Sequence, residues 1–159
     1  MRMTVALAAS LAWTGCSTGS GGLNLDSGPT TTREMTDEVR RSERLTLESL
    51  TLSRLSAIER SLNDFIRAER RIPKRLEELV PKYLAEIPEA ETGVRGHKDN
   101  SGVRYYAPSI IVDGQVNGTK LKDTGGWGYV HNEQQVIVFV DCVHKMMDGK
   151  FWYQARGVY

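Results

Sequence analysis

The chain has 159 residues, of which 40% are hydrophobic and 26% charged, a composition typical of one soluble globular domain rather than of a disordered or membrane-spanning chain. The formal net charge is +1, and removing the first fifteen residues, which include Arg2, leaves 20 basic and 20 acidic side chains. This balance gives no electrostatic reason to expect an anionic membrane surface or a nucleic acid as partner, and we predict no nucleic-acid partner.

Residues 1–15 have the layout of a secretory signal peptide. Arg2 precedes an apolar run from Val5 to Trp13, and two small residues follow before Cys16. The run is shorter than the about 20 residues that a membrane-spanning helix needs. With Cys16 directly after the small pair, the segment resembles a bacterial lipoprotein signal, although Trp13 stands where that family usually has Leu. The alternatives are an uncleaved N-terminal anchor and an ordinary secreted protein with a stray cysteine.

The lipoprotein resemblance implies lipid attachment at Cys16, and therefore a membrane partner reached through that anchor. Residues 16–32 are rich in Gly, Ser and Thr, which predicts a flexible tether between the anchor and a domain at 33–159. Ser17 stands where inner-membrane lipoproteins commonly carry Asp. We therefore expect an exported protein of the cell envelope, with the outer membrane or periplasm favoured.

A long helix is predicted next, because the chain contains neither Pro nor Gly from Thr32 to about Arg71. Thr36 is the expected N-cap, with acidic residues in the first turn. The leucines between 45 and 52 do not hold a heptad, which disfavours a two-stranded coiled coil. One face of the helix is apolar and should pack on a sheet; it carries Leu55, Ile58, Leu62, Phe65 and Ile66.

A short second helix is expected between Pro73 and Pro88, with Pro81 forcing its last part into a turn. Its apolar stripe has helical spacing and consists of Leu76, Leu79, Val80, Tyr83 and Leu84. We expect this helix to cap the core.

The remainder of the chain reads as strands. Residues 103–106 and 110–112 are strand-like, and Asp113-Gly114 is a two-residue hairpin signal. Residues 126–130 and 135–142 predict a second hairpin, and residues 150–155 a last strand after the Asp148-Gly149 turn. Helices first and strands afterwards predict an α+β fold, with a long and a short helix packed on a small antiparallel sheet.

The order of these motifs resembles the globular domain of type IV pilins and type II secretion pseudopilins, over about residues 55–152. The resemblance implies a helical spine against a small antiparallel sheet, and protein partners in a pilus or secretion assembly. The scaffold residues that carry it are Pro73, Leu76, Leu79, Pro81, Pro88, Gly126, Trp127, Asp148, Gly149 and Trp152.

The chain also departs from this family. Pilins begin with a highly apolar helix that fills the filament core, whereas residues 33–44 here carry eight charged side chains, among them Arg33, Glu34 and Asp37. Burying each of these in an apolar core costs on the order of several kcal/mol. A lipoprotein carrying a pilin-like head therefore fits better than a polymerising pilin.

No catalytic motif is present, and we predict no enzyme, no cofactor and no metal site. The glycines around Trp127 precede a strand, whereas phosphate-binding loops precede a helix, so close backbone packing explains them better. His97, His131 and His144 lie far apart in the sequence without ligand spacing, which argues against zinc. Cys142 ends an apolar run, as an inert buried thiol would.

Two kinds of ligand site stay open as alternatives. Pseudopilins of the group that this chain resembles can hold calcium, and the possible oxygen donors here are Asp113, Asp123, Asp141 and Asp148. Aromatic residues on the strands could also form a stacking surface, although core positions are commoner for them. We therefore predict a non-enzymatic exported lipoprotein that is an accessory or structural component of a type IV pilus or type II secretion apparatus. The alternative is a small periplasmic ligand-binding module with the same fold.

Overall fold

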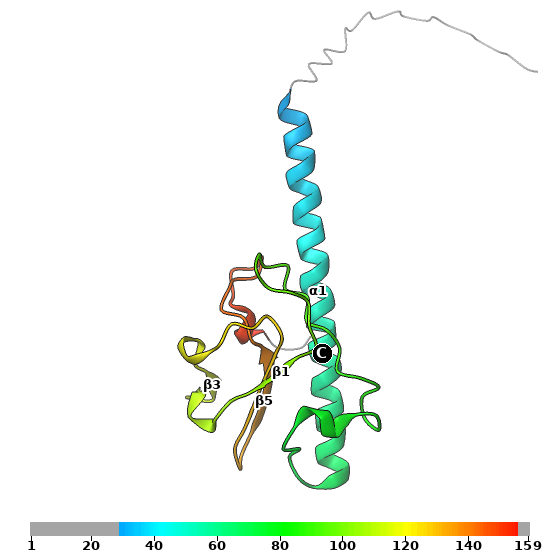
Figure 1. Cartoon of the computed structure of the whole chain (residues 1–159), viewed down its shortest axis with the longest axis vertical. Coiled ribbons are helices and arrows are strands. Elements are labelled where there is room, and N and C mark those ends of the chain that lie inside the picture. Colours follow the sequence, from blue (N-terminus) through cyan, green and yellow to red (C-terminus); the bar gives the residue numbers. More distant parts are fainter. Residues whose placement is uncertain (1–28, 156–159) are drawn as a thin grey trace, which may run out of the picture.

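The computed structural model describes residues 29–155 and consists of one long helix with a small α+β head beside its lower half (Figure 1). The helix α1 runs over Pro29–Glu69 and has 41 residues. Its C-terminal half packs against the head, and its N-terminal half projects beyond it. None of the helices in the described residues is long and apolar enough to cross a membrane.

The ends of α1 differ from the sequence prediction. The helix begins at Pro29, within the segment predicted as a tether, and Pro fits the first turn because that turn has no partner for an N–H. Thr36 is not an N-cap: its hydroxyl donates to the carbonyl of Thr32 at 2.8 Å inside the helix. At the other end, Arg70 adopts a left-handed conformation (φ 56°), which stops the helix.

The main sheet has three strands in the order β1-β4-β5: β1 (Val103–Tyr105), β4 (Trp127–His131) and β5 (Val136–Val140). β4 and β5 form the predicted second hairpin and are antiparallel. β1 lies parallel to β4, so the expectation of an antiparallel sheet is wrong. The chain between β1 and β4 is long enough to return to the starting edge, and such a crossover permits parallel pairing.

The crossover between β1 and β4 contains the other predicted hairpin. β2 (Ile111–Val112) and β3 (Gln115–Val116) are antiparallel and form a separate two-stranded sheet. Asp113 and Gly114 both have positive φ, 50° and 76°, as a type I′ turn requires. This prediction is confirmed.

Two predicted elements are replaced by single 3₁₀ turns. The expected second helix is only η1 (Leu76–Leu79), because Pro81 donates no N–H and restricts Val80 to an extended conformation (φ −90°, ψ 137°). The expected last strand is η4 (Trp152–Gln154), preceded by one isolated bridge at Phe151.

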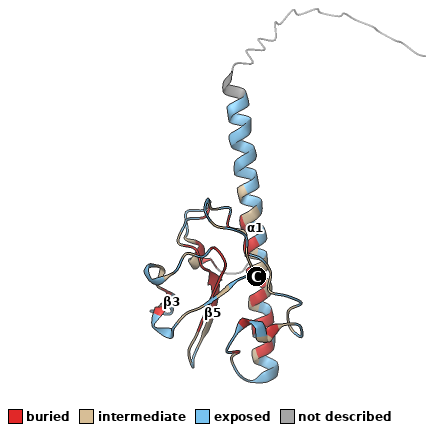
Figure 2. Cartoon of the chain, in the orientation of Figure 1, coloured by how far each residue is buried: buried red, intermediate tan, exposed pale blue. Residues whose placement is uncertain are grey.

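The core lies between α1 and the sheet, where the apolar face of α1 meets β5 and η1 (Figure 2). Leu55, Ile58, Leu62 and Phe65 are buried as predicted. A smaller cluster covers the other face of the sheet and consists of Ile110, Val116, Val130, Ile137 and Phe139. Both faces of the sheet are therefore covered, and the head buries its own core.

Candidate metal centre

Four side chains from three separate segments converge beside the sheet. His97 comes from the long loop before β1, Asp123 from the segment before β4, and Cys142 and His144 from the chain that follows β5. One ligand atom of each residue lies within 4.8 Å of the others. In the part of the chain that the structure describes, this is the one group of at least three such side chains placed to hold a metal ion.

Three distances inside the cluster match the edges of a tetrahedral coordination shell. Nε2 of His97 lies 3.4 Å from Oδ1 of Asp123, and Nδ1 of His144 lies 3.6 Å from the same oxygen. Sγ of Cys142 is 3.6 Å from Nδ1 of His144. A tetrahedron with metal–ligand bonds of about 2.0–2.3 Å has edges of about 3.3–3.8 Å. These three edges already have that length.

Neighbouring groups hold two of the ligands in place. The hydroxyl of the buried Thr92 lies 3.3 Å from Nδ1 of His97, which leaves Nε2 facing the cluster. The backbone N–H of Val143 donates to Oδ1 of Asp123 at 2.8 Å. At Gly125, a Cβ atom would come within 2.8 Å of the His97 side chain, so glycine permits this approach. Such outer contacts are typical of metal-binding histidines and carboxylates.

The cluster has a buried side and an exposed side. Cys142 is fully buried, and this burial, together with the nearby Asp123 carboxylate, raises the pKa of its thiol to about 12. The prediction that the thiol of Cys142 is buried is therefore confirmed. The side chain of His144 is 49% exposed, so solvent reaches the cluster from that side.

The separation of the histidines in the sequence argues against a metal site, but the fold brings two of them together. The rings of His97 and His144 meet edge to face with centroids 5.2 Å apart, whereas His131 ends β4 beside Tyr129. The one local signal is the short spacing of Cys142-x-His144, directly after β5.

The four aspartates considered for calcium do not come together in the described residues. Asp113 forms the β2–β3 turn, and Asp148 accepts from the backbone N–H of Lys150 at 2.9 Å. The carboxylate of Asp141 is buried and accepts hydrogen bonds from the hydroxyls of Tyr106 and Thr124.

The scaffold residues on which the pilin resemblance depends lie in the core or its turns. The carbonyl of Pro73 accepts from the hydroxyl of Tyr129 at 2.5 Å, and that of Pro88 accepts from the indole N–H of Trp127 at 2.6 Å. Gly126 leaves no room for a side chain, because a Cβ would lie 2.6 Å from the carbonyl of Gly102. Four of these residues are fully buried: Leu76, Leu79, Trp127 and Trp152. Pro81 follows η1. Gly149, which has a φ of 86°, forms a turn with Asp148.

The predicted signal peptide at 1–15 and the lipid attachment residue Cys16 lie outside the described residues. Comparison with known proteins finds no matching family model, no matching curated protein and no matching solved structure.

Proposed function

We propose that this chain is a non-enzymatic exported lipoprotein, anchored through Cys16, that serves as an accessory or structural component of a type IV pilus or type II secretion apparatus. The head is held beside a helical spine, as in the pilin-like domains that the sequence resembles. The observation that carries the proposal is the projecting half of that spine.

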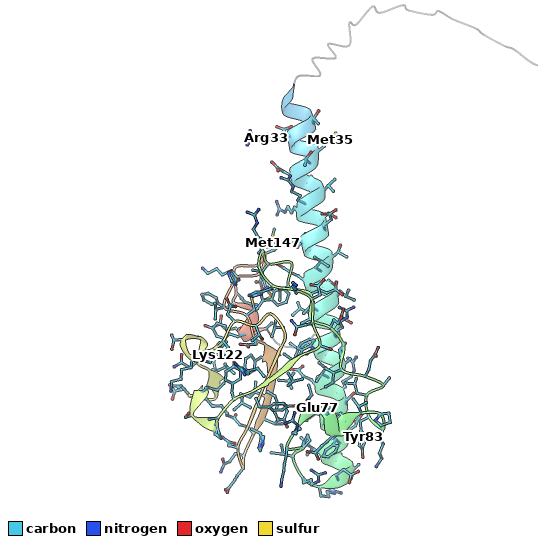
Figure 3. All side chains as sticks on the ribbon, viewed as in Figure 1. Arg33, Met35, Glu77, Tyr83, Lys122 and Met147 are labelled. Carbon is cyan, nitrogen blue, oxygen red and sulfur yellow. The ribbon has the colours of Figure 1, made fainter. Side chains whose placement is uncertain are left out.

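The part of α1 that projects beyond the head is exposed to solvent. Every residue from 32 to 43 is exposed, whereas the face that begins at Glu48 is buried against the head (Figure 2). Arg33 and Met35 lie on this projecting part, beyond Met147 at the near end of the head (Figure 3). An exposed helix of this length gains little stability from packing within its own chain, which favours a role in contacts with another protein.

One face of this helix has the composition of a packing surface. We call it the spine stripe; it consists of Ser42, Leu45, Thr46, Ser49, Leu50 and Ser53. Leu45 is 47% and Leu50 40% exposed, and the small residues between them allow close approach of another helix. Thr46 and Ser49 each lie nine residues, or about two and a half turns, before a core residue, Leu55 and Ile58. The spine stripe therefore faces away from the head.

The charged residues of the projecting half limit the kind of assembly that the chain can join. Asp37 and Arg40 pair at 3.5 Å on its surface, and both are well exposed. Such residues are stable in water or at a polar interface but not in an apolar filament core. The proposed role is therefore that of an accessory subunit docked through the spine stripe.

Mutation of the spine stripe tests this role. Ser49→Glu places a charge on the stripe and should abolish pilus formation or protein secretion in the producing cell. Ser109→Glu is a matched control, because Ser109 is exposed on the head and does not belong to the spine stripe. Equal levels of pilus formation or protein secretion with the two variants would contradict docking through the spine stripe.

The lipid anchor is tested separately. Cys16→Ser should lose labelling by a palmitate analogue and shift the chain to the soluble periplasm or to an uncleaved inner-membrane precursor. A wild-type chain that takes up no label and is already soluble would show that residues 1–15 are an ordinary signal peptide.

A groove at the C-terminal end of α1 favours the alternative of a ligand-binding module. It measures about 850 Å³ and is lined by Ile66, Arg67, Arg71, Pro108 and His131, among others. Its apolar side chains and guanidinium groups suit a small amphipathic anion. Saturable binding of such anions, lost in Arg67→Ala but not in Arg95→Ala, would favour this alternative over the assembly role.

A further inference from the structure

We propose that His97, Asp123, Cys142 and His144 form a structural zinc site that joins three segments of the head. The ligand atoms are Nε2 of His97, a carboxylate oxygen of Asp123, Sγ of Cys142 and Nδ1 of His144. This inference goes beyond the proposed function and does not depend on it, because the site belongs to the fold of the head in either functional reading.

The donor set selects zinc among the common protein-bound metals. Two imidazole nitrogens and a thiolate suit zinc, whereas calcium and magnesium take oxygen ligands almost exclusively. The tetrahedral edge lengths between His97, Asp123 and His144 agree with this choice. One thiolate and one carboxylate together carry two negative charges, which neutralise a divalent cation beside the buried core.

Binding requires one proton transfer and no redox step. The thiol of Cys142 loses its proton to solvent as the sulfur–zinc bond forms, and the imidazoles bind as neutral rings. His97 then keeps its remaining proton on Nδ1 and donates it to the hydroxyl of Thr92, which lies 3.3 Å away. This arrangement fixes the tautomer that presents Nε2 to the metal.

Four protein ligands leave no position for substrate, which makes the site structural rather than catalytic. The loop that carries His97 has no helix or strand of its own: residues 89–102 contain only the bridge between Ala90 and Asn100, and contacts of Glu91 with Thr51 and Arg54 join its start to α1. Within the described residues Cys142 is a free thiol, so no disulfide ties this loop down. Zinc would join it to the segments on both sides of the β4–β5 hairpin.

Cobalt substitution tests the ligand set. The full chain is purified without a histidine tag and with Cys16→Ser, which leaves Cys142 as its only cysteine. Titration with Co²⁺ should give one equivalent of binding, with the intense visible bands of tetrahedral cobalt and a thiolate-to-cobalt charge-transfer band. Added Zn²⁺ should remove both, because zinc binds such sites more tightly. Cobalt bound without the charge-transfer band would overturn the proposal.

Variants then assign each ligand. Cys142→Ser should lose the charge-transfer band, and the half-exposed His144→Ala should lose tetrahedral binding while remaining folded. His131→Ala is the matched control, because this histidine lies at the end of β4 outside the cluster and should bind as the parent does. Unchanged binding by His144→Ala, or equal losses in His131→Ala, would refute the assignment.

Thr92 is tested as a positioning residue. Thr92→Val should weaken zinc affinity about 10- to 100-fold, and Thr92→Ser should restore it because the hydroxyl returns. Excess zinc should also raise the melting temperature of the parent but not of His144→Ala. A melting temperature that zinc leaves unchanged in the parent would contradict a structural role.

Discussion

Replacing Phe65 with Ala tests the packing of the spine on the head. Phe65 is only 3% exposed, and its ring meets Tyr83 edge to face with centroids 5.4 Å apart. Truncating a buried Phe to Ala costs about 3–5 kcal/mol through lost transfer energy and the cavity that remains. That is a large fraction of the about 5–15 kcal/mol by which a domain is stable.

In a domain of this size, each kcal/mol lowers the melting temperature by about 2–4 °C, so Phe65→Ala should melt about 6–20 °C below the parent. Thermal unfolding followed by circular dichroism measures the shift. Met35→Ala is the control on the same helix, because Met35 is 66% exposed and should leave the melting temperature unchanged. A shift in Phe65→Ala no larger than that of the control would refute the packing of α1 on the sheet.

Two further predictions concern buried groups. Trp127 and Trp152 are both fully buried, so with Trp13→Phe the emission should be blue-shifted and iodide should quench it weakly; free quenching would favour an exposed stacking surface. Glu48 is buried and accepts from the backbone N–H of Met147 at 2.8 Å, and burial raises its pKa. Because the folded-state pKa is raised, ionisation costs stability as the pH rises through that value. Glu48→Gln should therefore gain stability relative to the parent as the pH rises above the ordinary range of a glutamate pKa, measured by urea unfolding at a series of pH values, and a relative loss of stability over that pH rise would contradict this.

Local patterns predicted much of the fold. The apolar spacing from Leu55 to Phe65 identified the buried face of α1, and Asp113-Gly114 identified the β2–β3 turn. Both signals act between residues close in sequence, where 3.6-residue periodicity and positive φ leave few alternatives. The glycines around Trp127 were also interpreted correctly: a Cβ at Gly128 would collide with the ring of Phe139.

The sequence-based predictions were wrong where contacts between distant parts of the chain decide the structure. Nothing local to Val103–Tyr105 indicates that it pairs in parallel with β4, because that depends on the path of the crossover between them. The stripe that begins at Leu76 has helical spacing, but the following Pro81 reduces it to a single 3₁₀ turn.

The candidate metal site shows the same limit of prediction from local sequence. His97 and Asp123 reach Cys142 only because the fold brings three segments together. Motif searches for zinc depend on ligands close in sequence, and here only the spacing of Cys142 and His144 meets that condition.

The most direct test of the assembly role is site-specific photo-crosslinking in the producing cell. A photo-reactive amino acid in place of Ser49 lies on the spine stripe, and one in place of Arg40 lies nine residues earlier, on the opposite face of α1. We expect a discrete adduct with a pilus or secretion subunit from position 49 and none from position 40. No adduct at position 49, or the same adducts from both positions, would contradict it.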